Sequence, residues 1–132
     1  MSTQRLFVYG SLRRDAPGGR SDLFGDGAEF LGRGRVHGRL LDLGAYPGVV
    51  PAVTRDEQVR GELYAIRGRR TLARLDAYED YDPCRPERSL FLRREVQVEL
   101  DSGATTTAWV YWYAGPAGRG RRIASGDYLD RA

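Results

Sequence analysis

Period-two alternation of apolar positions is the feature that most restricts how this chain can fold. Val59, Gly61, Leu63 and Ala65 occupy alternate positions and therefore share one face of an extended strand. Similar alternation returns in 90–100, after a segment with a different period. Because most connections between such segments are short, the strands should pair in antiparallel fashion. The pattern favours a curled sheet or a small barrel.

One segment has the period of a helix instead. Leu72, Leu75, Asp76 and Glu79 recur at i, i+3, i+4 and i+7, which places them on one stripe of a helix over 69–80. We therefore expect an α+β fold in which this helix packs against the sheet or barrel. The predicted strands are 4–10, 28–43, 49–53, 58–66, 90–100 and 105–113.

Glycine, proline and small polar residues separate these segments. We expect a Gly/Pro-rich loop over 13–20, a short helical piece near 21–25 and a loop over 82–88. Pro51 places the strand 49–53 at a sheet edge, because proline cannot donate to a strand ladder. The segment after the last predicted strand is interpreted as a Gly/Arg loop and a short tail.

Length and composition indicate one globular domain over 1–132. No apolar run approaches the roughly 20 residues that span a bilayer, and no leader-like apolar segment follows Met1. We therefore expect a cytoplasmic protein with no membrane partner. Cys84 and His37 are the only cysteine and the only histidine, and together they make a poor metal-ligand set.

The net charge of +3 is carried by a chain in which every basic residue is arginine. Arg33-Gly34-Arg35 and the run 119–122 have the composition of phosphate-contacting loops. Acidic residues are spread between them, and no recognition helix or RNA-binding motif is present, so we interpret them as solvated loops. We expect no nucleic-acid partner, whereas salt-sensitive binding to DNA or RNA would favour the opposite interpretation.

Carboxylates gather at the end of the predicted helix, at Asp76, Glu79, Asp80 and Asp82. Negative charge there opposes the helix dipole and costs a few tenths of a kcal/mol or more, so helix stability does not explain the cluster. Desolvation and neighbouring negative charge would raise the pKa of a partly buried Glu79, as a general acid/base near neutral pH requires. A solvated acidic helix end or an internal ion pair with an arginine would produce the same pattern.

A short apolar run, 6–9, ends at Gly10-Ser11 and is typical of a central strand buried on both faces. Gly10 lets the chain turn sharply and approach a ligand without an intervening Cβ. Successive main-chain N–H groups in such a turn can bind an anion. An ordinary strand that ends in a turn has the same pattern.

An ordered set of short motifs, spanning nearly the whole chain, resembles the gamma-glutamylcyclotransferase-like family, also called AIG2-like. The small bacterial members are the most similar. Each motif is weak alone, but their order makes the set specific. The motifs are Phe7–Leu12, Tyr46–Gly48, Val59–Tyr64, Leu75–Glu79, Phe91–Arg93 with Val96, Ala108–Tyr111 and Ile123–Leu129.

The resemblance implies a small mixed or antiparallel β-barrel with flanking helices. It also implies that Tyr9, Gly10, Ser11 and Leu12 hold a γ-glutamyl group and that Glu79 is the catalytic acid/base. In the implied reaction the α-amine of the γ-glutamyl group attacks its own side-chain amide carbonyl. An acyltransferase or lyase of this kind releases 5-oxoproline and an amine or amino acid, with no metal or organic cofactor.

The sequence departs from the family at Phe91, where Tyr is common, and at Tyr128, where Trp is common. Loss of a phenol at position 91 removes one hydrogen bond that a substrate could accept or donate. The leaving group stays open among glutathione, γ-glutamyl amino acids, γ-glutamyl amines and a biosynthetic intermediate. We expect a monomer acting on a small molecule. A non-catalytic ligand-binding protein of the same fold is the alternative, and Glu79 on the inward stripe favours the enzyme.

Overall fold

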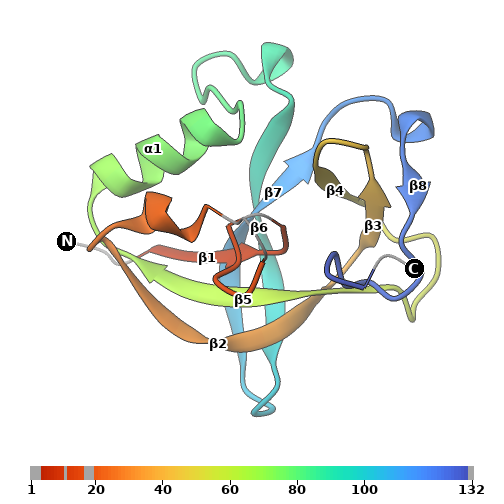
Figure 1. The fold of residues 1–132 in the computed structure, drawn as a ribbon, viewed down its shortest axis with the longest axis horizontal. Coiled ribbons are helices and arrows are strands. Elements are labelled where there is room, and N and C mark those ends of the chain that lie inside the picture. Colours follow the sequence, from red (N-terminus) through yellow and green to blue (C-terminus); the bar gives the residue numbers. More distant parts are fainter. Residues whose placement is uncertain (1–3, 11, 17–19, 131–132) are drawn as a thin grey trace.

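The computed structural model describes residues 4–10, 12–16 and 20–130, and five of its strands close into a barrel (Figure 1). Neighbouring strands are antiparallel in the order β1-β5-β2-β6-β7, and a parallel pair between Leu6 and Trp109 closes the ring. The predicted α+β fold with a small mixed barrel is confirmed. The barrel strands are β1 (Gln4–Val8), β2 (Ala28–His37), β5 (Gln58–Ile66), β6 (Phe91–Leu100) and β7 (Thr105–Tyr113).

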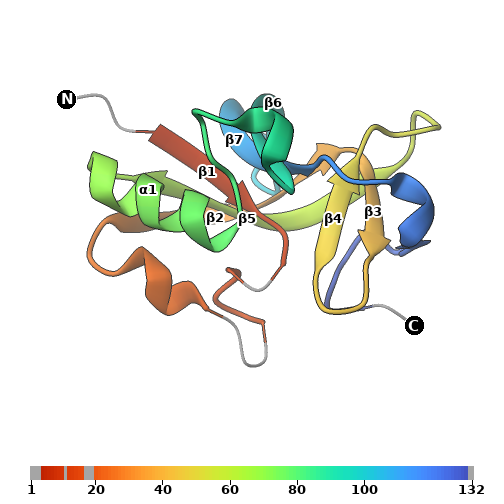
Figure 2. The same cartoon turned by 90° about the horizontal axis from the view of Figure 1, so that it is seen from above.

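A second sheet of three strands lies at one end of the barrel, in the order β4-β3-β8 (Figures 1 and 2). Prediction of a continuous strand over 28–43 was wrong, because the chain leaves the barrel at Gly38 and enters this sheet. A Cβ at Gly38 would lie 2.9 Å from Val49 Cγ1, so the Gly38 backbone lies too close to the Val49 side chain to carry a side chain of its own. The strands are β3 (Arg39–Asp42), β4 (Pro47–Val50) and β8 (Arg121–Arg122).

Two of these strands also differ from the sequence prediction. The strand predicted over 49–53 begins at Pro47 and ends before Pro51, although it does lie at a sheet edge. The two-residue β8 lies in a segment that was predicted to be a loop. Its backbone pairs with Leu41 and Asp42 of β3, and two residues are too few to show a periodic pattern.

The core lies on both faces of β1. Phe7 points into the barrel with Val59 and Leu63, whereas Leu6 and Val8 pack in an outer cluster beneath the helix. Residues 6–8 are all buried, as predicted for a central strand. The outer cluster contains side chains from the barrel, the helix and the segment before β2, such as Phe24, Tyr64, Ile66 and Leu75.

The helix α1 (Arg69–Tyr78) is stabilised by packing rather than by its own termini. Gly68 precedes it without a side-chain cap, and Arg69 and Arg70 oppose the helix dipole in its first turn. Leu75 is completely buried against the outer face of the barrel. Figure 2 shows α1 at the opposite end of the barrel from the three-stranded sheet. Three short 3₁₀ segments, η1 (Ser21–Phe24), η2 (Pro86–Arg88) and η3 (Ala117–Arg119), complete the described elements.

Close packing inside the barrel predicts a severe effect of the substitution Gly61→Ala. A Cβ at this position would collide with the carbonyl oxygen of Val8 and lie 2.7 Å from Cζ of Phe7. We expect a loss of about 1–3 kcal/mol in the free energy of unfolding, as overpacked cores show. Gly118→Ala is the control, because its Cβ would have no atom within 4 Å. Equal denaturant midpoints for the two variants would contradict the prediction.

Candidate active site

A cavity of about 310 Å³ opens beside the C-terminal end of α1, and it extends to the first residue of β4. Its walls come from six parts of the chain: β1 with the turn that follows it, the β3–β4 connection, the end of α1, the start of β6, β7 and the C-terminal segment. The lining residues are Phe7, Val8, Tyr9, Gly10, Leu12, Ala45, Tyr46, Pro47, Tyr78, Glu79, Asp80, Leu90, Phe91, Tyr111 and Tyr128.

Glu79 lies in the last helical turn and faces this cavity. The helix ends two residues earlier than predicted: Glu79 is its C-terminal cap and donates its N–H to the carbonyl oxygen of Leu75 at 3.0 Å. Asp80 then takes a positive φ of 54°, and its carbonyl oxygen accepts the N–H of Leu90 at 3.0 Å. This turn ends the helix with the Glu79 side chain half-buried in the cavity wall.

Burial raises the pKa of Glu79 from its usual 4.5 to about 7. The sequence prediction also invoked repulsion from neighbouring carboxylates, but desolvation is the cause of the shift, and the buried acid one turn earlier is paired. Asp76 is buried and accepts two hydrogen bonds from Arg93, Nε to Oδ1 at 2.7 Å and Nη2 to Oδ2 at 3.2 Å. Desolvation alone therefore accounts for the raised pKa.

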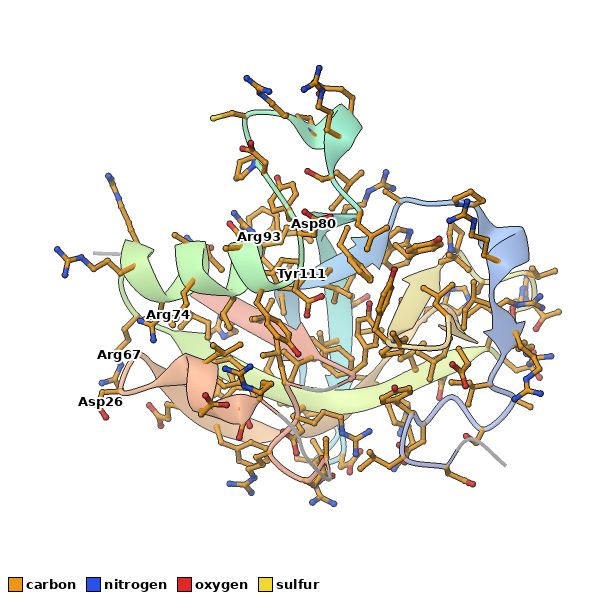
Figure 3. The ribbon with its side chains drawn as sticks, turned by 45° about the horizontal axis from the view of Figure 1, so that its top comes forward. Asp26, Arg67, Arg74, Asp80, Arg93 and Tyr111 are labelled. Atoms are coloured by element: carbon orange, nitrogen blue, oxygen red, sulfur yellow. The ribbon has the colours of Figure 1, made fainter. Side chains whose placement is uncertain are left out.

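The Asp76–Arg93 pair also bears on the structural alternative for Glu79. Tyr111 Oη donates to Asp76 Oδ1 at 2.6 Å, so this carboxylate joins α1 to both β6 and β7. Figure 3 shows Arg93 and Tyr111 at the C-terminal end of α1. Among the described residues, the ion pair formed at this helix end belongs to Asp76, and none involves Glu79. The alternative explanation for Glu79 was an internal ion pair with an arginine. That arginine, Arg93, is instead paired with Asp76.

The turn after β1 lines the same cavity as Glu79. Tyr9 is buried, and its hydroxyl donates to the carbonyl oxygen of Tyr111 at 2.7 Å. Burial, and then the charge of Glu79, raise the pKa of Tyr9 well above its usual value. Leu12 is also buried, whereas Ser11 lies outside the described residues. The cavity therefore brings together Tyr9, Gly10, Leu12 and Glu79.

The structure explains the glycine at position 10 by close packing against Pro47, whereas the sequence suggested a sharp turn that approaches a ligand. Its carbonyl oxygen accepts the N–H of Arg13 at 3.0 Å, so the chain does turn here, but the φ of Gly10 is not positive. A Cβ at Gly10 would lie 2.7 Å from Cγ of Pro47, a rigid ring that also lines the cavity. The glycine is needed because Pro47 approaches this closely.

Aromatic rings form much of the remaining wall, and of these the sequence connected only position 91 with the substrate. Tyr46, Tyr78, Tyr111 and Tyr128 all line the cavity. Phe91 is buried between Tyr46 and Tyr113, with ring centroids 5.9 and 5.7 Å away in edge-to-face geometry. The turn signal around Tyr46 and the aromatic strand 105–113 were the available clues, but neither indicates which rings face a cavity.

The site contains no evident metal centre. Within residues 4–10, 12–16 and 20–130, no three His, Cys, Asp or Glu side chains are grouped as metal ligands would be.

The described part of the chain contains no helix that is both long enough and apolar enough to cross a bilayer.

Comparison with known proteins matches the sequence and fold of this chain to one family. The sequence profile described as "Gamma-glutamyl cyclotransferase, AIG2-like" matches residues 6–130. The chain belongs to the AIG2-like gamma-glutamylcyclotransferase family, and the resemblance found in the sequence is confirmed.

Individual relatives cover the chain from end to end. The gamma-glutamylcyclotransferase family protein YtfP of Escherichia coli K12 is 38% identical over 128 residues, which are 96% of this chain and 97% of that protein. The solution NMR structure of ytfP from Escherichia coli superposes with a TM-score of 0.66 at 35% identity, covering 97% of this chain and 98% of that one.

A relative with a more specific name comes from Niallia circulans. This gamma-L-glutamyl-butirosin B gamma-glutamyl cyclotransferase is 37% identical over 110 residues. The match covers 82% of this chain and 65% of the relative.

The raised pKa of Glu79 predicts a pH-dependent stability. A carboxyl whose pKa is about 7 when folded and 4.5 when unfolded binds more protons in the folded state between these values. Its contribution to the free energy of unfolding is therefore favourable at low pH and is lost as the pH rises through about 7, at about 1.4 kcal/mol per pKa unit.

The variant Glu79→Gln should lack this dependence. We expect thermal melts of the variant and the wild type to coincide below about pH 4.5 and the variant to have the higher Tm above about pH 7. A difference in Tm that stays constant across this range would contradict a burial-raised pKa.

Proposed function

We propose that the protein is a gamma-glutamylcyclotransferase that releases 5-oxoproline from a γ-glutamyl amine or amino acid, with Glu79 as general acid/base. The supporting observation is a carboxyl with a pKa of about 7 in the wall of a cavity that the Gly10 turn also borders. A group with this pKa can both accept and donate a proton near neutral pH. Membership of the family supports the same reaction class.

The reaction is an intramolecular acyl transfer that needs one proton carrier. Glu79 takes a proton from the α-ammonium group of the substrate, and the freed amine nitrogen attacks the γ-amide carbonyl carbon. A new C–N bond closes the five-membered ring and leaves an oxyanion. Glu79 then donates this proton to the departing nitrogen as the original amide C–N bond breaks and the carbonyl re-forms. The regenerated carboxylate takes the second proton from the ring nitrogen and passes it to the released amine, so the products are 5-oxoproline and an ammonium ion.

The substrate would be held by the turn on the other side of the cavity. Tyr9, Gly10, Ser11 and Leu12 are the proposed binding residues, with main-chain N–H groups of the turn facing the α-carboxylate or the developing oxyanion. Tyr9 is fixed by its hydrogen bond to the Tyr111 carbonyl oxygen, and Gly10 is fixed against Pro47. Groups held in advance in this way do not have to reorganise during the reaction.

The charge of the cavity favours one kind of leaving group. Glu79 and Asp80 supply negative charge, and none of the described lining residues is an arginine or a histidine. The nearby guanidinium of Arg93 is engaged by Asp76. A leaving group with its own carboxylate would meet like charge without a cationic partner, whereas an uncharged or cationic amine can pack on the tyrosine rings. We therefore propose γ-glutamyl amines as better substrates than γ-glutamyl amino acids.

Removal of the proton carrier should abolish most turnover. Glu79→Gln keeps the size of the side chain, so we expect kcat to fall by about 10²–10⁴-fold with little change in KM. In the wild type, kcat/KM should decrease as the pH falls below about 7, because the base becomes protonated. Release of 5-oxoproline is the assay, and the exposed Glu95→Gln is the control. Undiminished turnover by Glu79→Gln would exclude Glu79 as the proton carrier.

Two substrates that differ only in a carboxylate test the leaving-group proposal. γ-Glutamyl-n-butylamine should have a kcat/KM at least about tenfold above that of γ-glutamyl-4-aminobutyrate, equivalent to about 1.4 kcal/mol. The difference should shrink at high ionic strength, because salt screens the repulsion. Equal values, or a preference for the carboxylate, would contradict the proposal without affecting the assignment of Glu79.

A further inference from the structure

A second carboxyl is buried more completely than Glu79 and does not line the cavity. Glu62 of β5 has an exposed fraction of 0% and lies opposite Val8 of β1 in the strand register. Its neighbour Tyr64 belongs to the outer core cluster, so Glu62 faces outwards from the barrel, towards the segment that follows the Gly10 turn. Burying a carboxyl costs several kcal/mol unless other groups offset its desolvation. This position therefore needs a physical explanation.

The partners of Glu62 show what it holds. Oε1 accepts the main-chain N–H of Arg14 at 2.8 Å and the hydroxyl of Tyr64 at 2.9 Å, while Oε2 has no partner among the described residues. The N–H of the preceding Arg13 closes the turn on the carbonyl oxygen of Gly10. Thus the N–H of Arg13 closes the turn, and the N–H of Arg14 attaches the turn to the barrel through Glu62.

Arg13 attaches the same turn to the opposite end of the chain. Its guanidinium is almost completely buried and bonds Asp15 through Nε and Nη2 at 2.9 and 2.8 Å. Nη1 bonds Oδ1 of Asp127 at 2.8 Å. Asp127 directly precedes Tyr128, which lines the cavity. The turn and the segment that contains Tyr128 are therefore joined by a partly buried ion pair.

We propose that Glu62 is a positioning residue, which, together with Arg13, holds the substrate-binding turn in place in the cavity that Glu79 lines. This inference rests on the proposed function, because it assumes that the turn binds the γ-glutamyl group. Glu62 itself touches no substrate. Its contribution is to fix the main-chain N–H groups of the turn, whose displacement by even 1 Å can cost about 10²-fold in rate.

Glu57 offers a matched control elsewhere in the fold. It is also a buried carboxylate, with an exposed fraction of 5%, and it accepts main-chain N–H groups from Val53 and Thr54. Arg39 and Arg122 of the three-stranded sheet pair with it. Glu57 does not line the cavity. A change that acts only through general destabilisation should therefore affect both positions alike.

The experiment compares Glu62→Met, Glu62→Gln and Glu57→Met. Methionine keeps the length of the side chain but cannot accept the Arg14 N–H well, whereas glutamine retains an acceptor oxygen. We expect Glu62→Met to lower kcat/KM by about 10–100-fold, mainly by raising KM, with the pH limb near 7 unchanged because Glu79 is intact. Glu62→Gln should recover most of the loss. Glu57→Met should lower Tm but leave KM within about twofold of the wild type.

Each outcome supports or overturns the proposal. A wild type that releases no 5-oxoproline refutes the proposed function. In that case hydrogen exchange still tests the anchoring of the turn: slow exchange of the Arg14 amide hydrogen in the wild type would support its hydrogen bond to Glu62. An active, folded Glu62→Met with an unchanged KM overturns the positioning role, as does an equal rise in KM for Glu57→Met. If Glu62→Met does not fold, Arg13→Gln decides: a raised KM supports the proposal and an unchanged KM overturns it.

Discussion

Burial of β1 on both faces is the constraint on which the rest of the structure depends. Phe7 fills the barrel interior, while Leu6 and Val8 support α1 from the other side. The same strand closes the barrel through its parallel pairing with β7. Because Tyr9 and Gly10 follow Val8 without interruption, the packing that stabilises the core also determines where the turn begins. Fold stability and the shape of the cavity therefore have a common physical origin.

Asp76, Glu57 and Glu79 differ in whether they form an ion pair, and this difference matches the role proposed for each. Asp76 is paired with Arg93, and Glu57 with Arg39 and Arg122, so attraction offsets their desolvation. Glu79 has no such ion pair among the described residues, and its burial appears as a pKa of about 7. Arg93 offsets the charge of Asp76, and desolvation is the cause of the raised Glu79 pKa.

Local patterns predicted most of the architecture because strands and helices differ in hydrophobic period. β5 occupies 58–66 as predicted, and the helical stripe from Leu72 to Glu79 corresponds to α1. The errors lie where tertiary contacts override the pattern. The strand predicted over 28–43 is divided at Gly38, where a Cβ would lie 2.9 Å from Val49 Cγ1. The helix ends at Tyr78 because Asp80 adopts a left-handed conformation, and β8 exists because two residues pair with β3.

The sequence by itself determined most of the extended segments, the one α-helical segment, the buried strand that leads into a glycine turn and the carboxylate at a helix end. These properties follow from periodicity and local backbone preference, which act over a few residues. Only the tertiary structure decided that Arg93 neutralises Asp76, that Glu62 holds Arg14 and that Arg13 reaches Asp127. These partners are separated by 17, 48 and 114 positions. Such pairings depend on how the barrel closes and how the helix docks, and local periodicity carries no information about either.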